Sequence, residues 1–111
     1  MKTFCEIMSL YILPGIRALI ARELIETHKL TQKEAARRLG MTQPAISQYK
    51  KYLRGNRVGT LNKDKEINEK ISSISTLIAN NEIDLDGIIE ELCNVCEMIR
   101  KKYGSNLRGI I

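Results

Sequence analysis

The chain has 111 residues, with 18 Lys and Arg against 13 Asp and Glu, and a formal net charge of +5 at pH 7. This length allows one compact domain or a small domain with an oligomerising extension, and it excludes a (β/α)8 barrel, a two-domain dehydrogenase and a kinase. The hydrophobic fraction of 43% is ordinary for a folded protein. Trp is absent and Phe occurs once, which disfavours a surface that stacks single-stranded bases on aromatic rings.

The sequence contains no run of about 18–20 consecutive apolar residues, so we expect no membrane-spanning helix. The opening MKTFCEIMSLYILPG has a Glu inside its apolar run and no small-residue cleavage site, so we expect no signal peptide. We therefore expect a cytoplasmic protein, whose three Cys stay reduced or bind a metal.

The charged residues are segregated along the chain. Residues 29–63 contain nine basic residues and one acidic residue, whereas residues 64–99 contain two basic and nine acidic residues. A basic block of this kind is typical of a surface that binds a polyanion, and it also fits a solvated surface balanced by the acidic part of the same fold.

Helical spacing dominates the first part of the chain. We expect a short helix over residues 4–12, then a boundary at Pro14 and Gly15, and an amphipathic helix from Pro14 to about residue 27. Pro14 suits the first turn of that second helix, because the N–H that proline lacks is unsatisfied there in any case.

Two short helices joined by a glycine are predicted next. Thr31 and Glu34 form a T-x-x-E capping box that opens a helix over residues 32–39. Gly40 then ends that helix in the left-handed conformation. The second helix runs over residues 43–53, with a threonine cap before it and a proline in its first turn.

Two longer helices follow, at about residues 63–79 and from Asp84 or Asp86 to about residue 102. The first carries one apolar stripe, which is formed by Ile67, Ile71, Ile74 and Ile78. The expected stripe of the last helix consists of Leu85, Ile88, Ile89, Leu92, Cys96, Ile99 and Tyr103. These stripes exceed what one small core requires, which favours a dimer.

The pair of short helices has the sequence properties of a helix-turn-helix. Ala35 and Ala36 are small enough for the two helices to pack closely, and Gly40 tolerates the turn. At about 100° per residue, one face of the second helix is apolar and faces the core. That face is formed by Ile46, Tyr49 and Leu53.

The opposite face is polar and suits the DNA major groove. Gln pairs with adenine, small apolar groups meet thymine methyls, and a hydroxyl donates to a base or phosphate. The candidate base-contact residues are Gln43, Pro44, Ala45, Ser47 and Gln48. Surrounding basic residues are placed to neutralise phosphates. They are Lys29, Lys33, Lys50, Lys51, Arg54 and Arg57.

The segment LTQKEAARRLGMTQPAISQYKKYLRG, residues 30–55, resembles the helix-turn-helix of the phage-repressor and Cro (XRE-like) class. The resemblance implies that Gln32 braces Gln43 and contacts a phosphate. A wider pattern over residues 13–53 resembles small archaeal helix-turn-helix regulators. The chain departs from that pattern at Pro44, which replaces a small residue, and in the added Lys50-Lys51 pair.

The cysteines form a second candidate site. Cys93 and Cys96 lie at i and i+3 on one helix face, and Cys5 joins them only if the first segment packs against the last helix. Regulators that this chain resembles often carry such a set. An iron–sulfur cluster with one open iron, a zinc with a fourth ligand, a disulfide between Cys93 and Cys96, and plain buried thiols all remain open.

The sequence therefore predicts an all-α domain of five to six helices. A helix-turn-helix unit would occupy residues 1–58, with its core at 14–58, and a C-terminal helical pair for dimerisation would occupy residues 62–111. The expected function is a dimeric, sequence-specific DNA-binding transcription regulator, with a cysteine-bound cluster or metal as its gate. The alternatives are an antitoxin-like interaction module and an RNA-binding protein with structural cysteines. No residue pattern supports an enzyme.

Overall fold

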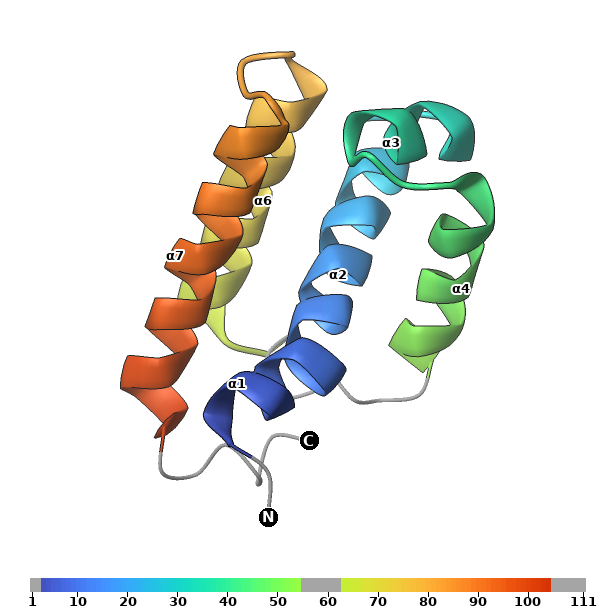
Figure 1. Ribbon diagram of the computed structural model, residues 1–111. Helices are drawn as coiled ribbons and strands as arrows, with labels where there is room; N and C mark the ends of the chain where they lie inside the picture. The colour runs from blue at the N-terminus through green and yellow to red at the C-terminus, as the bar shows by residue number, and fades with distance from the viewer. Residues whose placement is uncertain (1–2, 55–62, 105–111) are drawn as a thin grey trace.

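The computed structural model describes residues 3–54 and 63–104, without the side chains of Tyr11 and residues 50–54 (Figure 1). Its elements are α1 (Phe4–Ile7), the π-helix η1 (Met8–Ile12), α2 (Leu13–Glu26), α3 (Gln32–Arg38), α4 (Gln43–Arg54), α6 (Lys65–Ala79) and α7 (Leu85–Tyr103). Over the described residues the fold contains helices and no strand. The all-α prediction is confirmed.

The expected break at Pro14 and Gly15 is wrong. α1, η1 and α2 form one continuous helix of 23 residues, from Phe4 to Glu26. Just before the proline, the Leu13 N–H donates to the Met8 carbonyl five residues back, which widens the helix by a π-turn. A proline ring clashes with the carbonyl four residues before it in an α-helix. The wider turn gives the ring room, so the helix continues through Pro14.

By length and composition alone, this helix is long and apolar enough to cross a membrane, although we expected no such helix from the sequence. In the fold, however, its apolar side chains form the centre of the protein. Ile12, Ile16 and Leu24 have no exposed surface. The helix therefore has the packing of a core helix.

α2 lies between two helical pairs, with α3 and α4 on one side and α6 and α7 on the other (Figure 1). The large core joins α2 to the α6–α7 pair through residues such as Ile16, Ile74 and Val95. A smaller cluster joins α2 to α3 and α4 through Ala21, Ala36 and Ile46. The two predicted units thus share one central helix.

The predicted stripe of α6 is confirmed, because Ile67, Ile71, Ile74 and Ile78 are all buried. The predicted stripe of α7 is partly wrong. Val95 belongs to it, whereas Leu85 and Ile89 are 51% and 60% exposed. The buried positions Ile88, Leu92, Val95 and Ile99 follow a strict i, i+4, i+7, i+11 spacing. Because both stripes pack within the chain, they no longer argue for a dimer.

Local signals at the helix ends behave as predicted. The Thr31 hydroxyl accepts from the Glu34 N–H at 3.0 Å, and the Asp84 carboxylate accepts from the Gly87 N–H at 2.8 Å. Gly40 has a φ of +68°, as expected for the residue that ends α3. At the end of α2 the same left-handed conformation falls on Lys29, with a φ of +61°.

These two positions predict opposite effects on stability. Gly40→Ala should lower the free energy of unfolding by about 1–2 kcal/mol, because a Cβ is strained at this φ. The new methyl would also lie 3.0 Å from Leu85 Cδ2. Lys29→Gly, the matched control, should be neutral or stabilising by up to about 1 kcal/mol. Urea unfolding of both variants checks this, and a Gly40→Ala protein as stable as wild type would contradict it.

Candidate nucleic-acid interface

α3 and α4 pack closely on α2 through small side chains. Ala35 and Ala36 are fully buried on α3, and Ile46 is 1% exposed on α4. Tyr49 is half-buried, and its hydroxyl lies 3.6 Å from Met41 Sδ. These positions confirm the predicted inner face of the second short helix as far as its side chains are described. The side chain of Leu53 lies outside that part of the chain.

The opposite face of α4 is open to solvent. Gln43, Pro44, Ser47 and Gln48 are exposed, and Ala45 is half-buried. The Thr42 hydroxyl accepts from the Ala45 N–H at 3.4 Å, which caps the start of the helix as predicted. The proline lies in the first turn, where its missing N–H costs nothing. All five candidate base-contact residues therefore lie in the first half of α4.

A hydrogen bond ties this face to α3. The Ser47 hydroxyl donates to Gln32 Oε1 at 3.3 Å. The resemblance had implied that Gln32 braces Gln43, whereas in the structure its described partner is Ser47. Gln32 is half-buried and Gln43 is exposed. Gln32 therefore orients a residue one turn further along α4, and the Gln43 side chain extends toward solvent.

Basic residues surround this surface where the structure describes them. Lys33 and Arg37 are exposed on α3, and Lys29 is exposed just before it. Lys50, Lys51 and Arg54 belong to α4, but their side chains lie outside the described part of the chain. Arg57 also lies outside it. Their predicted phosphate contacts stay predictions.

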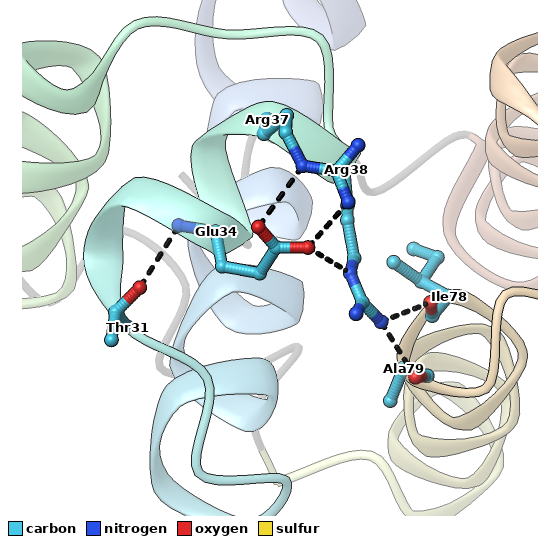
Figure 2. A network of polar contacts seen from close by, with 6 residues as sticks. All are labelled: Thr31, Glu34, Arg37, Arg38, Ile78 and Ala79. Atoms are coloured by element: carbon cyan, nitrogen blue, oxygen red, sulfur yellow. Dashed lines mark hydrogen bonds and ion pairs between the residues drawn. The ribbon is translucent and has the colours of Figure 1, made fainter.

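The Glu34 side chain departs from the predicted capping box. Its N–H binds Thr31 as expected, but its carboxylate pairs with Arg37 and Arg38, as Figure 2 shows. The Arg38 Nε donates to Glu34 Oε1 at 2.8 Å. A charged partner three or four residues on attracts the carboxylate more strongly than the backbone N–H does.

Arg38 also reaches across to the end of α6. Its Nη1 donates to the carbonyls of Ile78 at 3.1 Å and Ala79 at 2.6 Å (Figure 2). The last carbonyls of a helix have no partner within the helix and carry its negative dipole end, so a guanidinium there is stabilising. The side chain is 16% exposed, compared with 66% for Arg37. Sequence reasoning missed this contact, because forty residues separate its two partners.

Comparison with known proteins agrees with this geometry. Residues 22–55 match the family model described as Helix-turn-helix, which covers the end of α2, all of α3 and all of α4. The segment is a helix-turn-helix. No curated protein and no solved structure matches the chain. Helix-turn-helix segments of this class are DNA-binding modules of transcription regulators.

The match confirms the phage-repressor-like resemblance of the helix-turn-helix. It does not reach the first part of the wider pattern over residues 13–53, so the likeness to archaeal regulators stays a prediction.

Beyond the helix-turn-helix, ion pairs add to the apolar packing between α6 and α7. Lys70 binds Glu91 at 2.6 Å, and Lys102 binds Asp64 at 2.9 Å.

The three cysteines lie near the junction of α1 with α7. The guanidinium of Arg100 is 5.4 Å from the centre of the Phe4 ring, which brings the start of the chain to the helix that carries Cys93 and Cys96. Cys5 and Cys93 are exposed, and Cys96 is half-buried. Within the described residues, no group of three His, Cys, Asp or Glu side chains is arranged to hold a metal ion. Burial, reinforced by Cys93, raises the pKa of the Cys96 thiol.

The two arginines of α3 predict unequal losses of stability. Arg38→Met removes the bond to Glu34 and both bonds to the end of α6, and should lower the free energy of unfolding by about 1.5–3 kcal/mol. Arg37→Met also loses its bonds to Glu34 but should leave the free energy of unfolding nearly unchanged, since that pair is solvent-exposed. Chemical denaturation measures both. Equal losses would show that the contact with α6 contributes nothing.

The pKa of Glu34 predicts a pH effect on stability. Hydrogen bonds from Arg37 and then Arg38 lower this pKa from its ordinary 4.5 to about 2. The unfolded chain therefore takes up a proton first, so the stabilisation is complete above pH 4.5 and is lost as the pH falls from 4.5 to 2. Glu34→Gln should flatten the profile of unfolding free energy against pH in that window. Parallel profiles for Glu34→Gln and wild type would contradict the assignment.

Proposed function

We propose that the protein is a sequence-specific transcription regulator that binds double-stranded DNA by placing α4 in the major groove. The observation that carries this is the division of α4 into two faces. Ile46 and Tyr49 hold the helix against α2, while Gln43, Ser47 and Gln48 are exposed on its other face. The family match supports DNA binding as such, and the residues that read bases are our assignment.

The exposed residues have distinct proposed roles. Gln43 and Gln48 pair with the N6 and N7 atoms of adenine, and Pro44 and Ala45 contact thymine methyl groups. Ser47 donates its hydroxyl proton to Gln32, so its oxygen is free to accept from a base amino group, and the Gln32 amide N–H is free to donate to a phosphate. Lys33, with Lys50, Lys51, Arg54 and Arg57, neutralises phosphates and fixes the position of the helix.

We further propose that the protein acts in the cytoplasm as a homodimer. One helix-turn-helix reads only a short half-site, and dimers of this class bind two half-sites about 34 Å apart. The distribution of charge along the chain supports an orientation in which α3 and α4 face the DNA. Residues 29–63 are strongly basic and residues 64–99 are acidic, so the phosphates attract the first block and repel the α6–α7 pair.

Substitutions on α3 and α4 separate base reading from phosphate binding. Gln48→Ala should relax the preference at one base pair, at a cost of about 1–3 kcal/mol on the preferred site. Lys33→Ala should weaken binding to all sequences alike and reduce the salt dependence by about one phosphate contact. Competition binding with variant sites at several salt concentrations measures both effects.

Equal losses on every sequence for Gln48→Ala would overturn its assignment to a base. Preferential binding to RNA would favour the alternative of an RNA-binding protein. If the protein binds neither nucleic acid but captures a defined protein through its C-terminal helices, an antitoxin-like interaction module replaces the proposal.

A second candidate function is regulation through an iron–sulfur cluster or a zinc ion bound by the cysteines. It is supported by Cys93 and Cys96 at one helical turn on α7 and by the contact of Phe4 with Arg100, which places Cys5 nearby. The described arrangement does not bring three ligands together, and the raised pKa of Cys96 opposes the thiolate form. We therefore derive no regulatory step through such a group.

Metal analysis decides whether the cysteines bind a cluster or zinc, or are free thiols. Protein purified without oxygen is expected to contain no stoichiometric iron, sulfide or zinc, in wild type and in Cys93→Ser alike, because the donor set does not converge. Iron and sulfide that are present in wild type and lost in Cys93→Ser would show that the cysteines move together around a cluster. Zinc lost in the same way would show a structural metal.

A further inference from the structure

An apolar groove lies between α2, the turn before α4, and α7. It has a volume of about 410 Å³. Its lining includes Ile20 of α2, Met41 and Tyr49 of the helix-turn-helix, and Leu85 and Ile89 of α7. The volume lies at the small end of the range of about 300–1,000 Å³ that is typical of small-molecule sites.

The lining of the groove includes a cationic side chain. Arg17 lines it and is half-buried. Over the described residues its guanidinium forms no ion pair or hydrogen bond. Burial raises the pKa of Tyr49, and Arg17 acts in the opposite direction on this phenol and on the Cys96 thiol. The guanidinium therefore lies within electrostatic reach of both α4 and α7.

The rim of the groove is unusually apolar for a surface. Leu85 and Ile89 are among the few large hydrophobic side chains of the described chain that are more than half exposed. The Leu85 side chain also lies close to Gly40, at the turn of the helix-turn-helix. An apolar groove with a guanidinium among its lining residues has the polarity of a site for an amphipathic anion.

We propose that this groove binds a small amphipathic carboxylate, with the carboxylate on Arg17 and the apolar chain between Tyr49 and Ile89. About 410 Å³ corresponds to roughly fourteen waters at about 30 Å³ each, which suits a ligand of about ten non-hydrogen atoms. A planar guanidinium pairs with a carboxylate through two parallel hydrogen bonds.

A second copy of the chain fits the groove less well. The flank of α7 beside Leu85 and Ile89 exposes Asp86 and Glu90. A two-fold contact between two α7 helices would repeat these carboxylates across the axis and bring like charges together. A small ligand that fills only the groove does not repeat these carboxylates across an axis.

Binding is tested first without DNA. Octanoate and octanol are titrated into the full-length protein by calorimetry and by amide chemical shifts. Octanoate should bind at least about ten-fold more tightly, and Arg17→Met should reduce that preference to about two-fold or less. Lys101→Met, at an exposed cation of the same α7 helix, should keep the preference. Ile89→Ser should weaken both ligands alike.

Several results would overturn the site. No saturable binding of octanoate, equal binding of octanoate and octanol, or an unchanged preference in Arg17→Met each contradicts it. A dimer that Ile89→Ser dissociates, in a protein that does not bind octanoate, would show that a second copy covers the groove. Unfolding curves of the variants confirm that each is folded.

The regulatory consequence rests on the proposed DNA binding, whereas the site itself does not. A ligand between Tyr49, Met41 and α7 contacts the inner side of the helix that reads DNA. Octanoate, and not octanol, should then change operator affinity in wild type and leave it unchanged in Arg17→Met. If octanoate binds but the protein binds no DNA, the proposed function fails and the ligand site stands.

Discussion

Burial of α2 between two helical pairs is the constraint on which the rest of the structure depends. Ile16 and Leu24 are completely buried in the core shared with α6 and α7. Ala21 is buried against α3 and α4, and its small size lets these helices approach closely. Each large aliphatic side chain that is fully buried stabilises the fold by about 1.5–3 kcal/mol. The exposed face of α4 is therefore set by the packing of its inner face.

Two sets of polar contacts add to this packing. Arg38 joins the helix-turn-helix to the end of α6, and Ser72 donates to the Glu23 carboxylate at 3.0 Å between α6 and α2. The bonds of Arg38 connect α3 to the acidic half of the chain, and the bond of Ser72 connects α2 to it. The groove between α2, the turn before α4, and α7 lies where the two halves meet, and Leu85 and Ile89 border it beside the buried stripe of α7. The proposed ligand site is thus a consequence of how the two halves meet.

The sequence predicted the parts of the fold that local chemistry determines. Thr31, Gly40 and Asp84 act at helix ends through neighbouring backbone groups, so their roles are visible in a few residues. The two faces of α4 follow from the helical period. The continuous helix through Pro14 was not predictable in this way, because it depends on a π-turn that relieves the proline ring.

Contacts between distant segments were also beyond the sequence. Three features depend on how the helices pack. They are the hydrogen bonds of Arg38 to α6, the hydrogen bond between Ser47 and Gln32, and the position of Arg17 in the lining of the groove. The stripe of α7 was displaced for a related reason. Leu85 and Ile89 fit helical spacing as well as Val95 does, and the packing of α7 in the whole fold decides which of them is buried. The phosphate contacts of the basic residues stay predictions.

Selection of double-stranded DNA from a random pool tests directly whether α4 reads bases. The wild-type protein is expected to enrich one near-palindromic sequence, with half-sites about one helical turn apart and adenines at the positions that Gln43 and Gln48 reach. Retention of DNA without any enriched sequence, or no retention at low salt, would contradict the account of α4 as a helix that reads bases.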